Sequence, residues 1–234
     1  MIHRFGRRRI IFVIVFALLG MALCNAATQA KTNVSFLLMS WAVSNLLIVS
    51  FAYLFNWRRV FGKTDQGLFL WPAALFMAPF LALTHLTWWA QNFFSSSPIY
   101  GEVTSHHFVG RRCKFKDLPN GVTLVIDLTS EFATPHSVRD AVQTICIPTL
   151  DGCCPVWSQC WQAFVALKNN DGGVYICCAN GCGRSVTFMA AWILQTGQCV
   201  DVEEAIQMIR KVRPQANPNS DQLSSLRQLT AARF

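Results

Sequence analysis

The feature that most restricts the fold of this chain is a short segment, from Cys178 to Arg184, that joins a strand-like run to a helix-like run. The preceding residues 174–176 are apolar, and the following residues 186–195 are again mostly apolar. At such a junction the first backbone N–H groups of the helix have no intrahelical partner, and the helix dipole places partial positive charge there. The segment therefore predicts an anion-binding nest between a strand and a helix.

The residue types in this segment suit a phosphate and a covalent reaction. Gly181 and Gly183 permit positive φ angles and close backbone approach, and Arg184 offers a planar fork that matches two phosphate oxygens. The same positive field stabilises a thiolate at Cys178, which we expect to be the nucleophile, and Ser185 could donate a hydrogen bond to the sulfur as it leaves. The expected phosphate-binding loop consists of the residues between the thiol and the guanidinium: Ala179, Asn180, Gly181, Cys182 and Gly183.

A proton donor is also needed, because an alkoxide or phenoxide leaves phosphorus readily only when its oxygen is protonated. Asp151 lies upstream in a loop bounded by glycine and proline, so it could close over the site, and it could later act as the base for water. Asp127 is the alternative acid, although we expect it to be structural and Glu131 to hold the loop. The histidines show no zinc-like spacing, so neither a metal nor another cofactor is expected.

The segment resembles the active-site loop of the cysteine-based protein tyrosine phosphatases, in their compact dual-specificity branch, with the pattern His-Cys-x-x-Gly-x-x-Arg-Ser/Thr. The resemblance covers roughly residues 104–232, with one departure, since Cys177 stands where the family usually has histidine. It implies a dual-specificity phosphatase that hydrolyses a phosphomonoester through a cysteinyl-phosphate intermediate. The implied substrate is a phosphoprotein, on tyrosine, serine or threonine, or a membrane phospholipid. It also implies a general acid at about the position of Asp151.

The departure at Cys177 keeps two other functions open. Cysteine is a poorer hydrogen-bonding partner than histidine, so the domain could be a catalytically weak phosphate-binding module. Cys182 could be a small filler of the loop, or a resolving thiol that forms a reversible disulfide with Cys178 in a redox sensor.

The first part of the chain is much more apolar than the rest. Apolar runs cover residues 10–26, 34–56 and 68–89, and the second and third contain no charged residue and are long enough to span a bilayer. Tryptophans lie at or near the ends of these runs, as interfacial aromatic residues often do: Trp57, Trp71, Trp88 and Trp89. The first run follows several arginines, Arg4 among them, and ends in small residues, so it could also be a cleaved signal peptide.

We expect three parts: an all-α transmembrane region of about three helices at residues 1–90, a linker at 91–103, and the catalytic domain at 104–234. In the last part, apolar runs alternate between strand and helix types, which predicts an α/β domain with a mostly parallel central sheet flanked by helices. The expected strands are 106–109, 123–128, 144–148 and 173–177. The expected helices are 156–168, 184–195, 202–212 and 221–232.

The charge follows the same division. The net charge is +8, and Asp65 is the only acidic residue among residues 1–99, so the basic excess belongs to the membrane flanks and favours lipid headgroups over nucleic acid.

The positive-inside rule places the N-terminus in the cytoplasm, and three spans would then place the catalytic domain on the opposite side. All ten cysteines except Cys24 lie in the catalytic part, which favours a reducing compartment instead. The side of the membrane and the oligomeric state stay open.

Overall fold

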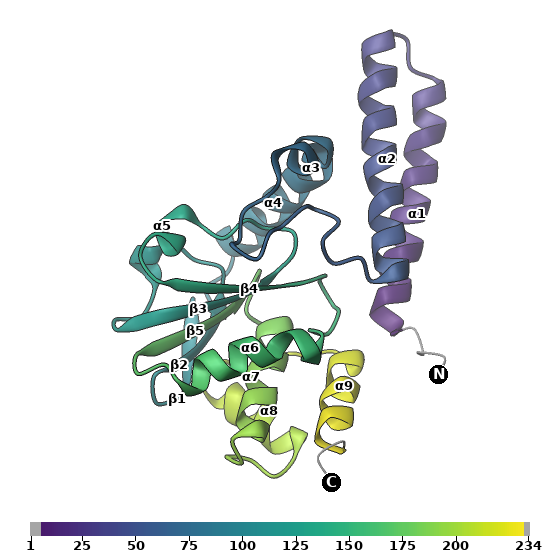
Figure 1. Ribbon diagram of the computed structural model, residues 1–234. Coiled ribbons are helices and arrows are strands. Elements are labelled where there is room, and N and C mark those ends of the chain that lie inside the picture. The colour runs from purple at the N-terminus through teal and green to yellow at the C-terminus, as the bar shows by residue number, and fades with distance from the viewer. Residues whose placement is uncertain (1–5, 232–234) are drawn as a thin grey trace.

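The computed structural model describes residues 6–231, which form an α/β domain and an N-terminal group of helices (Figure 1). Arg4 of the expected basic flank and residue 232 of the expected last helix lie outside the described residues. A long helical hairpin projects away from the α/β domain, and two shorter helices lie over the edge of the domain beside it (Figure 1).

The domain is built on one mixed sheet with the order β1-β2-β5-β3-β4. Its strands are β1 (Tyr100–Thr104), β2 (His107–Arg111), β3 (Val122–Thr129), β4 (Gln143–Thr149) and β5 (Gly173–Cys178). The pairs β2–β5, β5–β3 and β3–β4 are parallel, and only the edge pair β1–β2 is antiparallel. The mostly parallel sheet is therefore confirmed, and its central strand is the one that ends at the expected nucleophile.

Helices cover both faces of the sheet. One face packs against α6 (Trp157–Lys168), α7 (Arg184–Gln195), α8 (Val202–Val212) and α9 (Ser220–Ala231), and the other lies under α5 (His136–Arg139) (Figure 1). The short helix η1 (Phe115–Asp117) lies between β2 and β3 in the chain. Because side chains alternate along a strand, Ile176 and Cys178 of β5 belong to the larger core, whereas Tyr175 and Cys177 belong to the smaller one. The nucleophile candidate thus lies on the face that α7 covers.

The first two apolar runs form α1 (Arg7–Thr28) and α2 (Asn33–Phe55), which pack antiparallel as a hairpin (Figure 1). The Ser50 hydroxyl donates to the Val13 carbonyl at 2.9 Å and ties the two helices together. Within the described residues, these are the two helices whose length and composition would allow them to cross a membrane.

The third predicted span is not one helix but two, α3 (Trp71–Phe76) and α4 (Ala78–Phe93), so the expectation of three spanning helices was too simple. The break has a clear physical cause, since Pro79 has no N–H to donate within a helix. The Asn45 amide of α2 then bonds both separated backbone groups, because its nitrogen donates to the Phe76 carbonyl at 3.0 Å and its oxygen accepts from the Phe80 N–H at 3.4 Å. The Trp41 indole also donates to the Phe76 carbonyl, at 2.6 Å.

The segment between α2 and α3 inserts a lysine into the α/β domain. Lys63 is 1% exposed, and its ammonium donates to the Asp127 carboxylate at 2.8 Å and to the Thr129 carbonyl at 2.8 Å. Burial alone would raise the pKa of the Asp127 carboxyl, but the Lys63 charge and hydrogen bonds from Lys63, Thr134 and Thr129 outweigh it and hold that pKa below its usual value. The N-terminal region therefore supplies the counter-ion of a buried carboxylate on β3.

We predict that Lys63→Met destabilises the protein by about 3–5 kcal/mol, because it leaves the Asp127 carboxylate buried without its cation. Adding Asp127→Asn should recover most of this loss by removing the uncompensated charge. The measurement is the thermal unfolding midpoint of the detergent-solubilised protein.

The unfolding midpoint of the wild type should also fall in acid. The pKa of Asp127 is lower in the folded protein than its unfolded value of 3.8, so the ionised carboxylate stabilises the fold above that value. This stability is lost as the pH drops through the folded pKa.

The matched control for Lys63→Met is Arg59→Met. It breaks the exposed Arg59–Asp65 pair of the same segment and should barely move the midpoint, because exposed ion pairs contribute little. If the Lys63→Met variant unfolds at the same temperature as this control, the buried pair does not hold the two regions together.

Candidate active site

The expected phosphate loop lies at the carboxyl end of β5 and leads directly into α7. Cys178 is buried, its sulfur accepts a hydrogen bond from the Gly181 N–H at 3.3 Å, and the Ser185 hydroxyl lies 3.3 Å from the same sulfur. Gly181 has φ of 69°, and a Cβ there would lie 2.4–2.6 Å from backbone atoms of Gly110 and Arg111, so only glycine fits. The structure therefore brings the predicted thiol, glycine and serine together.

All the loop carbonyls point outward. Each one from Cys178 to Gly183 accepts a hydrogen bond from outside the loop, in chain order from Arg112 N (2.8 Å), Trp88 Nε1 (2.9 Å), Arg213 Nη2 (2.9 Å), Arg213 Nε (2.5 Å), Asn217 N (2.8 Å) and Thr187 N (2.8 Å). A peptide whose carbonyl points outward presents its N–H on the inner side, so the loop offers its donors to a central anion.

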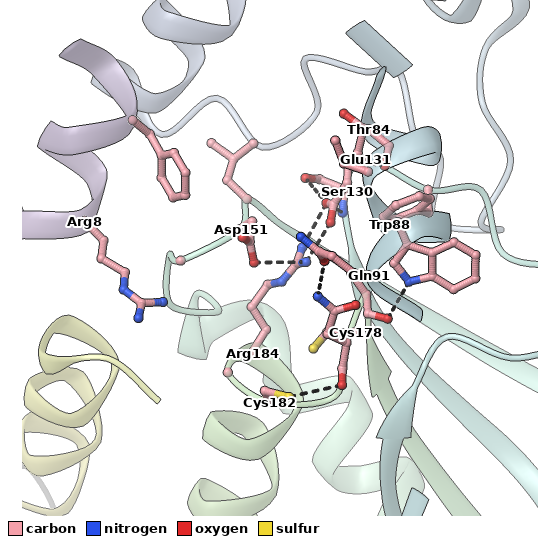
Figure 2. Close-up of a pocket in the computed structure, with 18 of the residues that line it drawn as sticks. Arg8, Thr84, Trp88, Gln91, Ser130, Glu131, Asp151, Cys178, Cys182 and Arg184 are labelled. Atoms are coloured by element: carbon pink, nitrogen blue, oxygen red, sulfur yellow. Dashed lines mark hydrogen bonds and ion pairs between the residues drawn. The ribbon is translucent and has the colours of Figure 1, made fainter. Parts of the chain in front are cut away.

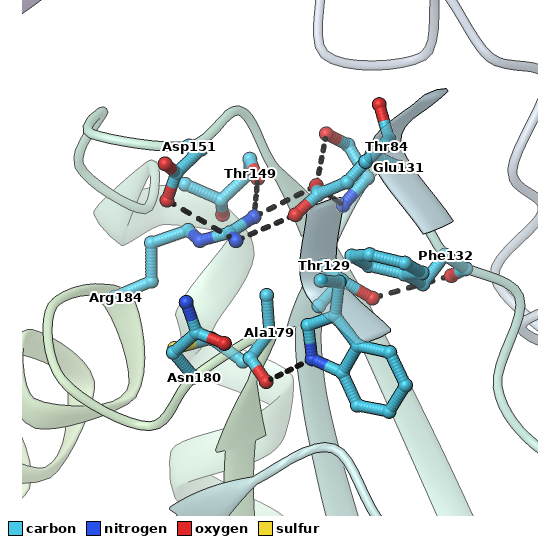
Figure 3. A network of polar contacts seen from close by, with 12 residues as sticks. Thr84, Thr129, Glu131, Phe132, Thr149, Asp151, Ala179, Asn180 and Arg184 are labelled. Carbon is cyan, nitrogen blue, oxygen red and sulfur yellow. Dashed lines mark hydrogen bonds and ion pairs between the residues drawn. The ribbon is translucent and has the colours of Figure 1, made fainter. Parts of the chain in front are cut away.

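The Arg184 guanidinium is buried and fixed from one side by a carboxylate (Figure 3). Its two terminal nitrogens donate to the two Glu131 oxygens at 2.9 and 2.6 Å, and one also donates to the Thr149 carbonyl at 2.7 Å. Burial alone would raise the pKa of the Glu131 carboxyl, but the Arg184 charge and hydrogen bonds lower it below its usual range. The Arg184 Nε is buried with no partner among the described residues, so it can donate to a bound oxyanion.

Asp151 lies at the mouth of the site, with one oxygen 3.3 Å from Arg184 Nη2 and a side chain that is 63% exposed (Figure 3). Its loop is held from α9 and the segment before it, where Asn219 donates to the Gly152 carbonyl at 2.8 Å and Gln222 donates to the Cys153 carbonyl at 3.0 Å. Asp127, the alternative acid, instead lies beneath the site in its ion pair with Lys63.

The two unusual cysteines occupy different places. Cys177 lies opposite Asp127 in the pairing of β5 with β3, and burial, with the Asp127 charge adding to it, raises the pKa of this thiol well above its usual value. Cys182 lines the site, its sulfur donates to the Asn180 carbonyl at 3.2 Å, and burial together with the Cys178 charge raises its pKa as well. Both are therefore neutral thiols at neutral pH. No group of three His, Cys, Asp or Glu side chains in the described part of the chain could hold a metal ion.

The site opens into a cavity of about 420 Å³ to which the N-terminal helices contribute one wall (Figure 2). Arg8 of α1 and Thr84, Trp88 and Gln91 of α4 line it together with the loop residues. Sequence reasoning missed this wall, because the apolar runs were interpreted only as membrane spans. It also missed Arg213, because its hydrogen bonds to the loop carbonyls join residues distant in the chain.

We predict that Trp88→Phe weakens the binding of inorganic phosphate about five- to ten-fold, in line with the net value of about 1 kcal/mol for one hydrogen bond. Phenylalanine keeps a ring over Phe132 but removes the indole N–H that holds the Ala179 carbonyl outward. Calorimetric titration of phosphate into the solubilised protein measures the effect. The control is Trp89→Phe, one residue along α4, whose exposed ring stacks on Phe93 and should leave the affinity unchanged.

The chain is similar to known proteins both in sequence and in fold. A family model described as "dual specificity phosphatase, catalytic domain" matches residues 113–232. Among solved structures, Tk-PTP in its active form is 22% identical, with 57% of this chain and 97% of that chain covered and a TM-score of 0.51. A variant of human DUSP28 is 20% identical, with 58% and 96% covered and a TM-score of 0.50. At this identity the two structures show a shared fold only. The curated proteins include no match.

Proposed function

The chain belongs to the family of dual specificity phosphatase catalytic domains and is a cysteine-dependent phosphatase, and from this premise we propose that it hydrolyses a phosphomonoester through a phosphocysteine at Cys178. The observation that carries the proposal is the loop from Cys178 to Arg184, with its carbonyls bonded outward and the Arg184 Nε free to donate. Such a loop binds three phosphate oxygens while the sulfur faces the phosphorus.

In the first step the Cys178 thiolate attacks phosphorus, an S–P bond forms, and the bond to the leaving oxygen breaks. Asp151 donates its proton to that oxygen, so the product leaves as an alcohol or phenol. Arg184 and the loop N–H groups bind the equatorial oxygens, where charge is concentrated in the transition state. The position of Asp151 beside Arg184, at the mouth of the cavity, supports this role.

In the second step water attacks the phosphocysteine, and the Asp151 carboxylate takes a proton from it. The S–P bond breaks and its electron pair returns to Cys178, where the Ser185 hydroxyl, 3.3 Å away, can stabilise the thiolate. Inorganic phosphate then leaves. No other co-reactant is required by this balance.

We further propose that residues 1–90 anchor the protein in a bilayer, with residues 91–103 as a linker and 104–234 as the catalytic domain. The α1–α2 hairpin would supply two spans, so the N-terminus and the catalytic domain would share one side of the membrane. Arginines gather at that end of the hairpin: Arg7, Arg8, Arg9, Arg58 and Arg59. The positive-inside rule then favours the cytoplasm, in agreement with a catalytic thiol that must stay reduced.

We predict that Cys178→Ser abolishes turnover of p-nitrophenyl phosphate and leaves no radiolabelled phosphoenzyme after an acid quench. Asp151→Asn should slow hydrolysis of an alkyl phosphate about 10²–10⁴-fold, and of the aryl ester less, because a good leaving group needs less protonation. Both are measured by phosphate release under reducing conditions, with Cys24→Ser, an exposed cysteine far from the site, as the unchanged control. If wild type and Cys178→Ser bind phosphate equally and neither turns over, the protein is a phosphate-binding module instead.

The membrane arrangement predicts a labelling result. Lys31 lies in the short turn between α1 and α2, so Lys31→Cys in a Cys24→Ser background should react with a membrane-impermeant maleimide in intact cells. The native cysteines of the catalytic domain should react only after the membrane is opened. Labelling of the catalytic cysteines in intact cells would place that domain on the outer side and contradict the proposed topology.

A further inference from the structure

The lining of the cavity above the phosphate loop combines two chemically different groups of side chains. The first group is the thiol, the guanidinium and the proposed acid: Cys178, Arg184 and Asp151. The second group is a cluster of five aromatic side chains, here called the aromatic wall: Phe12, Phe16, Tyr53, Phe61 and Phe80. A ligand that contacts both groups must therefore combine a phosphate with an apolar body.

The aromatic wall is one continuous packed surface that connects the hairpin to α4. Ring centroids lie 4.8 Å apart between Phe12 and Tyr53, 5.6 Å between Phe16 and Phe80, and 5.4 Å between Phe61 and Phe80. Three of these side chains come from α1 and α2, the two helices proposed to cross the bilayer. Most of the aromatic wall thus comes from the helices that are proposed to cross the bilayer.

The depth of the site matches the level of lipid headgroups. Arg8 belongs to the first turn of α1, where the basic flank marks the membrane surface, and it lines the same cavity as Cys178 (Figure 2). The loop that carries Asp151 lies beside the start of α1, since a Cβ added at Gly152 would come within 3.1 Å of Phe12 and 3.7 Å of Arg8. The reacting groups therefore lie at the membrane surface and not at the end of a long tether.

The charges that line the cavity suit one phosphate and not several. Its lining contains two cations, Arg8 and Arg184, and two carboxylates, Glu131 and Asp151. Both carboxylates lie within ion-pair distance of Arg184, so the site holds no surplus of positive charge beyond the loop N–H groups and Arg8. A headgroup with several phosphates would lack counter-ions there.

We propose that the substrate is a membrane phospholipid whose headgroup ends in a single phosphate monoester, an inference that rests on the proposed function. The phosphate binds in the loop, the headgroup and glycerol fill the cavity, and the upper parts of the acyl chains lie against the aromatic wall. A cavity of about 420 Å³ holds a headgroup but not two acyl chains, so the chains continue into the bilayer beside the hairpin. The products are the dephosphorylated lipid, which stays in the membrane, and inorganic phosphate.

A chain-length series on the wild type tests this without any variant. The probes are glycerol 3-phosphate, dihexanoyl phosphatidate, dioleoyl phosphatidate and a phosphatidylinositol monophosphate in phosphatidylcholine vesicles, a phosphotyrosine peptide, and p-nitrophenyl phosphate. We expect kcat/KM for dihexanoyl phosphatidate, or for the monophosphorylated inositol lipid, to exceed that for glycerol 3-phosphate by about 100-fold, which corresponds to about 2.7 kcal/mol of chain contact.

The outcomes separate this proposal from the proposed function. If the aryl phosphate and the peptide are hydrolysed but no lipid is, the enzyme is a protein phosphatase and the lipid assignment is wrong. The same conclusion follows if the lipids react no faster than glycerol 3-phosphate. If no substrate is hydrolysed by the folded wild type, the proposed function itself fails.

A pair of variants on one helix tests the aromatic wall directly. Phe16→Ala should lower kcat/KM for dihexanoyl phosphatidate about ten-fold more than it lowers kcat/KM for p-nitrophenyl phosphate. Leu18→Ala, on the exposed side of α1, should leave both values unchanged. Phe16→Leu serves as a milder second variant if the alanine form does not fold. Equal losses on both substrates would show that Phe16 acts only through stability and would overturn its role in lipid binding.

Discussion

The site depends on one backbone constraint, which is that every carbonyl of the loop from Cys178 to Gly183 must turn away from the anion. A short loop cannot satisfy those carbonyls by itself, so the donors must come from elsewhere. The structure draws them from α4, from the end of β2, from the two segments around Arg213 and Asn217 and, for the Gly183 carbonyl, from Thr187 of α7. The phosphate nest is therefore a property of the assembled fold, and α4 of the N-terminal region is part of that assembly.

Two buried ion pairs at the end of β3 reinforce this constraint. Arg184 pairs with Glu131 inside the site, and Lys63 pairs with Asp127 below it. Each carboxylate would be costly without its cation, and the cation for Asp127 comes from a segment outside the phosphatase-like part of the chain. Cys177 lies beside that pair, in the position where histidine is usual in the family. The Lys63–Asp127 ion pair and the threonine hydrogen bonds to Asp127 thus order the end of β3 beside Cys177.

The predictable parts of the structure are those governed by local chemistry. Four of the five strands and all four large helices of the domain follow from residue periodicity and from turn residues such as Asp201, whose side chain accepts from the Glu204 N–H at 2.8 Å. The phosphate-binding loop can be predicted from glycines such as Gly181, which adopts a positive φ angle there. The break in the third apolar run cannot be predicted from local chemistry. Hydropathy does not exclude Pro79 from a membrane helix, and it does not show that the Asn45 amide bonds to the backbone groups separated at the break. The contact of Trp88 with the loop is equally invisible, since it joins residues distant in the chain.

The position of Asp151, the proposed acid, depends on the N-terminal helices. A general acid on a free surface loop must be ordered each time it closes over the substrate. Here Leu150 and Cys153, on either side of Asp151 and Gly152, are buried in a cluster with residues of α2 and α4, while Gly152 lies beside α1. The loop of the proposed acid is thereby packed against the helices that are proposed to lie in the bilayer. Because the aromatic side chains that line the cavity belong to the same packed cluster as Leu150 and Cys153, the proposed lipid-binding surface and the loop of the proposed acid share one set of packing contacts.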